Sequence, residues 1–221
     1  MKTHSTAQYL KWVLFVALIV CSFFVPMASE KAKAEGVGRA GYANGFNDQF
    51  TANNGNWGSW SGSSWSYKAG VIRGIGQKDK LSGLEFTKAQ YANLEYQAKM
   101  KRIGCATCVN RLYIRSTAVG WIYYGYTNTG QFYVESCNSV SCTMWQSFKA
   151  SNKIVKGGFN TLKVLAVNNS YKFYINNSMV YSRTVTGPLT LIKTGYVGVG
   201  FYSTSAVGNS LDVDFAILVK K

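Results

Sequence analysis

The feature that most constrains the fold is a strict alternation of apolar and polar residues that recurs along the chain. In NLEYQAKMK, one set of alternate residues is mainly apolar and the other is charged or amide-bearing. The first set is Leu94, Tyr96, Ala98 and Met100, and the second is Glu95, Gln97, Lys99 and Lys101. A period of two places the two sets on opposite faces of a strand, so this segment predicts a strand with one buried face.

Turn signals separate the alternating segments. GWIYYGYTN and GQFYVES are separated by TNTG and predict a hairpin, as do NTLKVLAV and YKFYI around Asn168–Ser170. In INNSMVYS, Asn176 and Asn177 stand where a tight hairpin requires positive φ, which Asn tolerates. Prolines number only two and no long helical period occurs. The pattern predicts an all-β chain folded as a single antiparallel β-sandwich without a linker or an internal repeat.

The first 34 residues have the layout of a secretory signal peptide. A basic start precedes the apolar run WVLFVALIVCSFFV, and AKA offers small residues for cleavage. The run is shorter than the ~20 residues of a membrane span, so we expect no membrane span in the mature chain. A lipoprotein attached through Cys21 is the alternative, disfavoured by bulky Val20 before it. The expected organisation is a signal peptide (1–34), a loose lead-in (35–45) and one sandwich domain (46–221), secreted or held in the cell envelope.

The mature chain is expected to be strongly basic. Removal of the signal peptide takes away Lys2, Lys11, Lys31, Lys33 and Glu30, which lowers the net charge from +15 to +12. Such a surplus attracts acidic polysaccharides and other polyanions, although the lysines are spread along the chain and also fit a solubilising surface. We therefore expect a glycan or polysaccharide partner, acidic ones included, and no nucleic acid.

Several segments, taken in order, resemble a known superfamily. They are FNDQF, NWGSWSGSSWSYKAGVIRG, YANLEYQAKMK, NRLYIRS, GGFNTLKVLAVNNSYKFYINNSMVY and GYVGVGFY with LDVDFAIL. Together they resemble the concanavalin A-like, laminin G-like jelly rolls, in particular small secreted domains related to the keto-glycoside hydrolase type. The resemblance covers Phe46 to Leu218 and implies a jelly-roll fold, with Phe159 and Asn177 departing from the usual Trp and Gly. The catalytic laminarinase-like members carry Glu-x-Asp-x-x-Glu, which this chain lacks.

The mature chain has four cysteines in two close pairs. Cys105 and Cys108 form CATC, and Cys137 and Cys142 form CNSVSC. An even number in an exported chain favours disulfides, and we favour the two local pairings. Structural zinc on all four thiolates and a redox-active Cys-x-x-Cys are the alternatives.

Few carboxylates are available for catalysis or metal binding. Asp212 and Asp214 share a strand face and, with Asp48 on the opening strand, could hold calcium; a polar edge-strand face is the simpler interpretation. If the chain is an enzyme, Glu95 and Glu135 are the candidate acids. The single histidine, His4, lies in the signal peptide, which argues against a Ser-His-Asp triad and catalytic zinc.

Aromatic residues carry the strongest functional signal. Flat rings that pack on sugars, combined with guanidinium and amide groups, are typical of glycan sites. If the strands are neighbours, one concave polar surface is formed by Arg111, Tyr113, Arg115, Tyr133, Glu135 and Trp145. An ordinary solvated sheet face is the alternative. In NWGSWSGSSWSY, Trp57 and Trp65 are expected at the core edge and Trp60 in an exposed position for stacking.

The sequence therefore predicts a secreted, non-catalytic carbohydrate- or cell-surface-binding protein. A glycoside-acting hydrolase of the same fold and a structural or adhesive extracellular protein are the alternatives.

Overall fold

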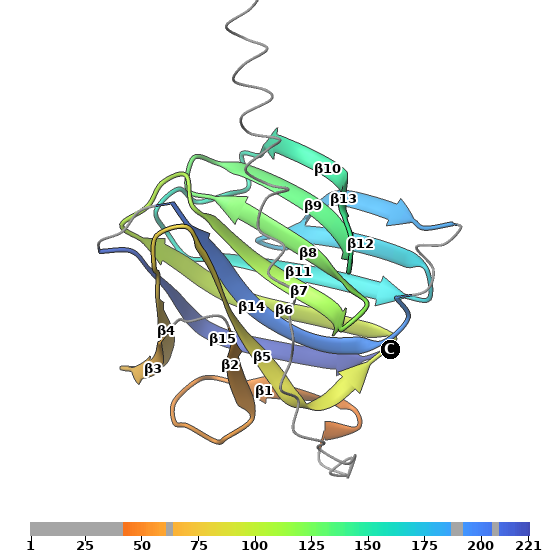
Figure 1. The fold of residues 1–221 in the computed structure, drawn as a ribbon, viewed down its shortest axis with the longest axis horizontal. Coiled ribbons are helices and arrows are strands. Elements are labelled where there is room, and N and C mark those ends of the chain that lie inside the picture. The colour runs from red at the N-terminus through yellow and green to blue at the C-terminus, as the bar shows by residue number, and fades with distance from the viewer. Residues whose placement is uncertain (1–41, 61–63, 187–191, 205–207) are drawn as a thin grey trace, which may run out of the picture.

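The structure is a computed structural model that describes residues 42–60, 64–186, 192–204 and 208–221 (Figure 1). The predicted signal peptide and most of the lead-in lie outside the described residues. About two thirds of the described residues lie in antiparallel strands, which form two sheets packed face to face (Figure 1). Within the described residues, no helix is long and apolar enough to span a membrane.

Sheet A has the strand order β13-β12-β11-β6-β15-β4-β3, and β1 also pairs with β15. Its strands are β1 (Gly45–Asp48), β3 (Trp65–Lys68), β4 (Val71–Ile75), β6 (Leu94–Ile103), β11 (Asn160–Val167), β12 (Ser170–Ile175), β13 (Ser178–Thr184) and β15 (Ser210–Lys220).

Sheet B has the strand order β10-β9-β8-β7-β14-β5-β2. Its strands are β2 (Trp57–Trp60), β5 (Lys80–Tyr91), β7 (Val109–Thr117), β8 (Gly120–Thr127), β9 (Gln131–Asn138), β10 (Cys142–Ala150) and β14 (Gly195–Ser203). Consecutive strands along the chain often belong to different sheets, as a jelly roll requires.

The core lies between the sheets and follows the predicted alternation. On β6, the four residues Leu94, Tyr96, Ala98 and Met100 are all fully buried, whereas the residues between them are half-buried on the outer face. Leu112 and Ile114 face the same core from sheet B. Trp57 and Trp65 pack against its edge, which confirms their predicted role. Burial of such rings and aliphatic chains is the main stabilising contribution, on the order of 2 kcal/mol for each side chain.

Asparagines form the predicted tight turns. Asn168, Asn176 and Asn177 all have positive φ, of 52°, 48° and 67°. The side-chain oxygen of Asn176 also accepts a hydrogen bond from the backbone N–H of Thr161 at 2.9 Å, which fixes the β12–β13 turn against β11. The hairpins that these turns close are confirmed by the register of β11, β12 and β13.

Candidate functional site

The four described cysteines form two local disulfides. Cys105 pairs with Cys108 in the connection from β6 to β7, and Cys137 pairs with Cys142 between β9 and β10. Both predicted pairings are confirmed. Since no thiolate remains free on these four residues, the disulfides argue against the zinc alternative.

The three aspartates proposed for calcium are each bound to a different partner. Asp48 accepts hydrogen bonds from Phe50 N–H and Trp57 Nε1, at 2.9 and 2.8 Å. Asp212 binds Arg73 through both carboxylate oxygens, at 2.6 and 2.7 Å, and Asp214 pairs with Lys99 at 2.6 Å. The structure therefore does not bring Asp48, Asp212 and Asp214 together as one ligand set.

The two candidate catalytic glutamates lie on different sheets. Glu95 is on the outer face of sheet A, where Lys221 and Lys163 contact it at 2.8 and 3.7 Å and lower the pKa of its carboxyl. Glu135 is on β9 of sheet B, paired with Tyr123 of β8. Their side chains leave the sandwich in opposite directions, so the structure does not bring them together as an acid–base pair.

Arg115 and Trp145 also lie elsewhere than predicted. Arg115 has φ of 51° at a bulge in β7, which turns its side chain into the interior, where it is 1% exposed. There it donates hydrogen bonds to the carbonyls of Ala92 and Asn168 and to the hydroxyl of Tyr171. Trp145 sits at a register shift in β10 and packs in the core against Tyr171.

The remaining predicted residues meet on the outer face of sheet B. Arg111, Tyr113, Tyr133 and Glu135 project there together with Trp60, the last residue of β2. Residues that sequence reasoning did not assign complete the set. We call the following six side chains the aromatic surface: Trp60, Tyr113, Trp121, Tyr123, Tyr133 and Phe148. The alternation of Trp121, Tyr123 and Gly125 along β8 places them on one face of the strand, and this pattern could have predicted Trp121 and Tyr123 from the sequence.

Three rings of the aromatic surface lie across glycines of the neighbouring strand. A Cβ on Gly83 would fall 2.1 Å from the Trp60 ring, and one on Gly198 would fall 2.2 Å from the Tyr113 ring. On Gly125 it would fall 2.5 Å from the Tyr133 ring. The register pairs each of these glycines directly with the residue whose ring covers it. Because glycine has no side chain, each ring can lie flat against the sheet instead of projecting away from it.

A second layer covers the buried tyrosines. Tyr113 and Tyr133 are only 1% and 2% exposed. The half-buried indole of Trp60 donates to the Tyr113 hydroxyl at 2.9 Å, and Phe148, which is 42% exposed, stacks on Tyr133 at 4.8 Å. Arg111 lies over Tyr123 and Tyr133, at 4.5 and 5.8 Å from the ring centres. These contacts fix Trp60, Phe148 and Arg111 over the buried tyrosine rings.

The ionisable groups of this face are perturbed by burial. Burial raises the pKa of the Glu135 carboxyl, and the positive charge of Arg111 opposes part of that shift. Burial also raises the pKa of Tyr123 to about 12. A second carboxylate, Glu85 of β5, lies on the same line across sheet B as Glu135 of β9. The register pairs the residues of this line, which we call the lateral row, in the order Glu135, Tyr123, Tyr113, Gly198 and Glu85, so four strand spacings separate the two glutamates. At roughly 4.8 Å per strand, the two backbone positions are roughly 19 Å apart.

Three polar atoms of this face are shielded from water without a hydrogen-bond partner among the described residues. They are Arg111 Nε, Trp121 Nε1 and Tyr133 Oη. Buried polar groups in folded proteins are usually satisfied. Eleven further buried side-chain atoms of the described residues, among them Tyr96 Oη and Tyr124 Oη, also lack a partner, so these three atoms do not by themselves distinguish this face.

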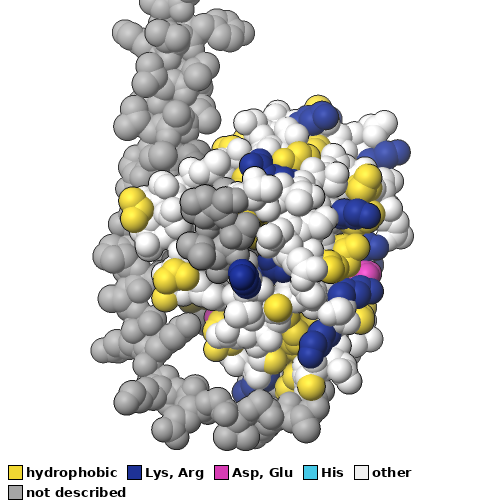
Figure 2. Space-filling view, turned by 90° about the vertical axis from the view of Figure 1, so that its right-hand side faces the viewer, with side chains coloured by type: hydrophobic (Ala, Val, Ile, Leu, Met, Phe, Trp, Pro, Cys, Tyr) yellow, Lys and Arg dark blue, Asp and Glu magenta, His cyan; other side chains and the backbone are white. Residues whose placement is uncertain are grey.

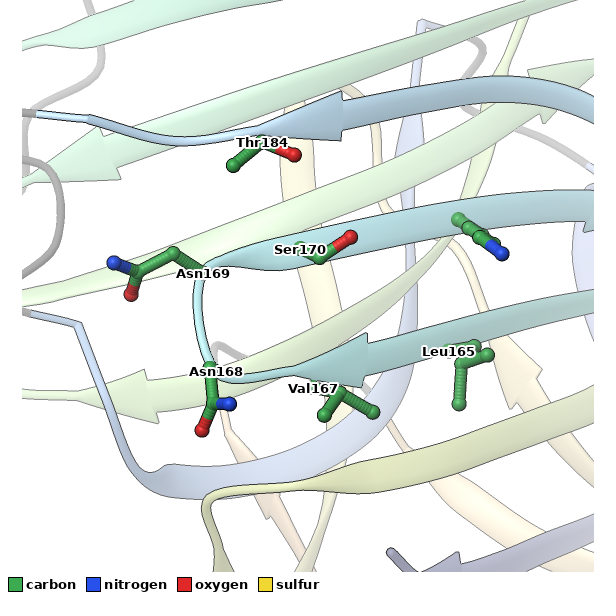
Figure 3. Close-up of a pocket in the computed structure, with 7 residues that line it drawn as sticks. Leu165, Val167, Asn168, Asn169, Ser170 and Thr184 are labelled. Atoms are coloured by element: carbon green, nitrogen blue, oxygen red, sulfur yellow. The ribbon is translucent and has the colours of Figure 1, made fainter.

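The outer face of sheet A differs in composition. Lys99, Lys101, Lys163 and Lys172 alternate with core residues on β6, β11 and β12, so they share that face. Figure 2 shows lysine and arginine side chains gathered in a column down one side of the molecule, with few acidic side chains among them. A shallow pocket of about 520 Å³ opens at the β11–β12 turn (Figure 3), but the residues that line it include no aromatic ring.

Comparison with known proteins supports the fold. No family model matches the chain, and no curated protein matches it by sequence. Solved structures with similar folds include a Bacillus licheniformis beta-glucanase (TM-score 0.64, 11% identity, 80% of this chain and 99% of that chain). A carbohydrate-binding module, CBM66, from Bacillus subtilis is also similar (TM-score 0.57, 12% identity, 71% of this chain and 91% of that chain). The fold is a concanavalin A-like jelly-roll sandwich, as the sequence resemblance implied.

Proposed function

We propose that this chain is a secreted carbohydrate-binding protein that holds a polysaccharide against the outer face of sheet B. The observation that carries the proposal is the aromatic surface, in which three rings lie over glycines and two contact the guanidinium of Arg111. Sugar rings pack their apolar C–H faces on such side chains and use guanidinium and indole donors for their hydroxyls. The similar folds of a carbohydrate-binding module and of glucanases support the same class of ligand.

The polar groups of this face suit a ligand rich in hydroxyl groups. A hydroxyl both donates and accepts hydrogen bonds, so it can pair with guanidinium, indole and phenol groups such as those of Arg111, Trp121 and Tyr133. Phe148 covers Tyr133 and is itself partly exposed. We expect Phe148 to move aside when a sugar occupies this position, because it belongs to the edge strand β10.

Binding to a panel of neutral and acidic polysaccharides tests the proposal. Trp60→Ala should weaken binding by up to about tenfold, since a stacked ring contributes about 0.5 to 1.5 kcal/mol to such contacts. Tyr174→Ala, on the outer face of sheet A, is the matched control and should bind as the wild type does. If no polysaccharide binds, or if both variants weaken binding equally, the proposal fails. Self-assembly without glycan binding would instead favour the adhesive alternative.

A glycoside-acting hydrolase is the second candidate, because the raised pKa of Glu135 suits a proton donor. Glycosidases place two carboxylates about 5 to 9.5 Å apart, whereas the backbones of Glu135 and Glu85 are roughly 19 Å apart across four strand spacings, which disfavours them as a pair. Release of reducing sugar that disappears in Glu135→Gln would establish this candidate. Binding without release of sugar would favour the non-catalytic protein.

A further inference from the structure

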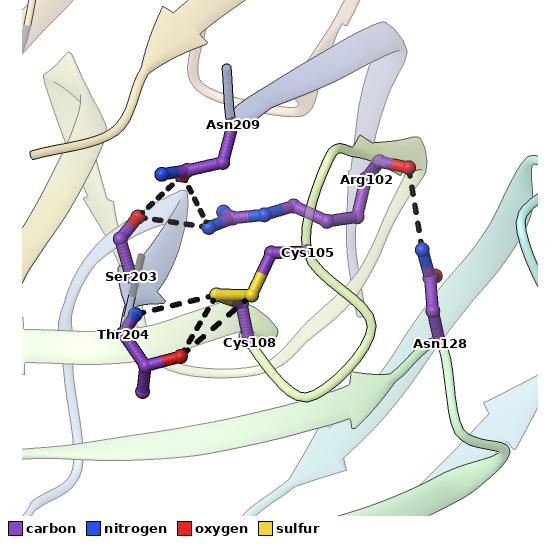
Figure 4. Close-up of a disulfide and its surroundings, with 7 residues drawn as sticks. All are labelled: Arg102, Cys105, Cys108, Asn128, Ser203, Thr204 and Asn209. Atoms are coloured by element: carbon purple, nitrogen blue, oxygen red, sulfur yellow. Dashed lines mark hydrogen bonds between the residues drawn. A yellow bond between two sulfur atoms is a disulfide. The ribbon is translucent and has the colours of Figure 1, made fainter. Parts of the chain in front are cut away.

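The two disulfides differ in what surrounds their sulfur atoms. At Cys105–Cys108, the sulfur of Cys108 accepts a hydrogen bond from Thr204 N–H at 3.3 Å, and the Thr204 hydroxyl lies 3.5 Å from Cys108 and 3.7 Å from Cys105 (Figure 4). At Cys137–Cys142, both sulfurs lie within 4.8 Å of the Glu135 carboxylate and pack in an aromatic cluster. Donors stabilise a thiolate, whereas an adjacent carboxylate destabilises it.

A buried cation lies in the segment that carries Cys105–Cys108. Arg102 is 1% exposed and stands three residues before Cys105 in the chain (Figure 4). Its guanidinium donates to Ser203 Oγ at 2.8 Å and to Asn209 Oδ1 at 2.7 Å, and Ser203 precedes Thr204 in the chain. No carboxylate pairs with Arg102 among the described residues, and its Nε and its second terminal nitrogen have no hydrogen-bond partner there. Burial lowers the pKa of Arg102 to about 10, so it stays protonated at neutral pH.

The disulfide is also accessible from one side only. Cys108 is fully buried, whereas Cys105 is half-buried and lines a cleft of about 650 Å³ at the β6–β7 connection. The side chains of Lys101, Asn128 and Lys156 line the same cleft, and its lining residues include no Asp or Glu. An incoming thiolate would therefore meet a cationic opening that leads to Cys105.

We propose that Cys105–Cys108 is a thiol–disulfide exchange centre that oxidises a dithiol of a peptide or protein. A thiolate of the dithiol attacks Cys105 Sγ and forms a mixed disulfide. The Cys105–Cys108 bond breaks, and its electron pair leaves on Cys108 as a thiolate, which Thr204 stabilises. The second thiolate of the dithiol then attacks its own mixed-disulfide sulfur and displaces Cys105. The dithiol loses two electrons and becomes a disulfide, and Cys105 and Cys108 gain them and become thiols.

The chemistry of exchange explains the arrangement. A leaving thiol with a low pKa departs faster, and stabilisation of the reduced form makes a disulfide more oxidising. Both effects require the favourable groups to surround the buried sulfur rather than the attacked one. Thr204 N–H, which contacts Cys108 and not Cys105, satisfies this requirement, while Cys105 faces the cleft.

Equilibration of the full chain in glutathione buffers tests the proposal, with Cys137–Cys142 as the internal control. After alkylation of free thiols, peptide mass spectrometry reports the reduced fraction of each pair. We expect half of Cys105–Cys108 to be reduced at a ratio of [GSH]² to [GSSG] at least about a hundredfold lower than the ratio that half-reduces Cys137–Cys142. This corresponds to a reduction potential that is higher by roughly 60 mV for a two-electron couple. Trapped glutathione should be attached to Cys105. A reduced dithiol peptide should be oxidised stoichiometrically by the chain.

Thr204→Val is the matched variant, because Thr204 is exposed and the backbone N–H remains. It should raise the ratio required by Cys105–Cys108 about threefold or more and leave Cys137–Cys142 unchanged. Equal reduction of the two pairs, greater resistance of Cys105–Cys108, or glutathione on Cys108 would each overturn the proposal. An unshifted Thr204→Val would do so as well.

Discussion

The outer faces of the two sheets use cations and tyrosines in opposite ways. On sheet A, Lys163 lies 4.6 Å above the ring of Tyr174 and 3.7 Å from the carboxylate of Glu95, and all three groups are in contact with solvent. On sheet B, Arg111 lies 4.5 Å above the ring of Tyr123, close to Glu135, and both Tyr123 and Glu135 are 6% exposed. A cation, a tyrosine ring and a glutamate carboxylate thus form a solvated surface on sheet A and a desolvated cluster on sheet B.

If the chain binds a polysaccharide as proposed, this difference would separate its recruitment from its recognition. The lysines of sheet A would provide a field that attracts polyanions over a distance, but each exposed ion pair contributes little stability. The cluster of sheet B has low exposure and fixed geometry, which would discriminate between ligands. We therefore expect salt to slow association with acidic polysaccharides, while the aromatic surface sets which polysaccharide is bound.

The largest expected effect tests whether the rings of sheet B must lie flat. Gly198→Ala would place a Cβ 2.2 Å from the Tyr113 ring and 2.4 Å from the backbone oxygen of Leu84, which cannot move away. We expect a loss of about 3 kcal/mol in the free energy of unfolding, measured with urea. Gly58→Ala is the control in the same lateral row, since its Cβ meets only the Thr87 methyl group, at 3.0 Å. Equal losses in both variants would contradict the flat arrangement.

A smaller effect should distinguish the two cations. Arg111→Met leaves Glu135 buried without its neighbouring positive charge and should cost about 2 kcal/mol of stability near neutral pH. Lys163→Met removes an exposed cation above a similar ring and should cost about 0.5 kcal/mol or less. Urea unfolding of the two variants under one set of conditions gives the comparison. Comparable losses would show that the two clusters are energetically alike.

The smallest effect concerns pH, because the two glutamates should titrate in opposite directions. The raised pKa of Glu135 means that its stabilising contribution is present below the ordinary carboxyl value of 4.5 and is lost as pH rises through its folded-state pKa. The lowered pKa of Glu95 means that its contribution is present above 4.5 and is lost as pH falls through its folded-state pKa. We expect each change to be no more than about 1 kcal/mol.

Unfolding free energies of Glu135→Gln and Glu95→Gln between about pH 3 and pH 8 test these signs. The Glu135 variant should remove a decline on the alkaline side, and the Glu95 variant should remove one on the acidic side. A wild-type curve matched by both variants throughout would refute the opposite titration.

The sequence predicted those parts of the fold that depend on local pattern. The alternation in β6, the asparagine turns and the two local disulfides need no knowledge of distant residues, and all three are found. Arg111 and Tyr113 were likewise placed together correctly, because β7 is regular up to Ile114.

The predictions were wrong where a strand departs from its two-residue alternation or where the position of a residue depends on pairing between distant segments. One left-handed residue at the β7 bulge turns Arg115 into the core, and a register shift in β10 does the same for Trp145. The separation of Glu95 from Glu135 depends on which sheet each strand joins, which neither strand encodes alone. Trp60 looked exposed among small polar residues, but Gly83, distant in sequence, provides the space in which its ring lies.

Two arginines without carboxylate partners among the described residues also constrain how the whole sandwich can move. Arg115 joins β7 of sheet B to the β5–β6 and β11–β12 connections. Arg102, at the end of β6, joins sheet A to Ser203 of β14 in sheet B, and the Cys105–Cys108 disulfide lies in the β6–β7 connection. Hydrogen bonds of Arg115 and Arg102 thus join the two sheets at both ends of the sandwich. We expect them neither to slide nor to open during binding, so adaptation to different sugars is confined to side-chain rotations such as that of Phe148.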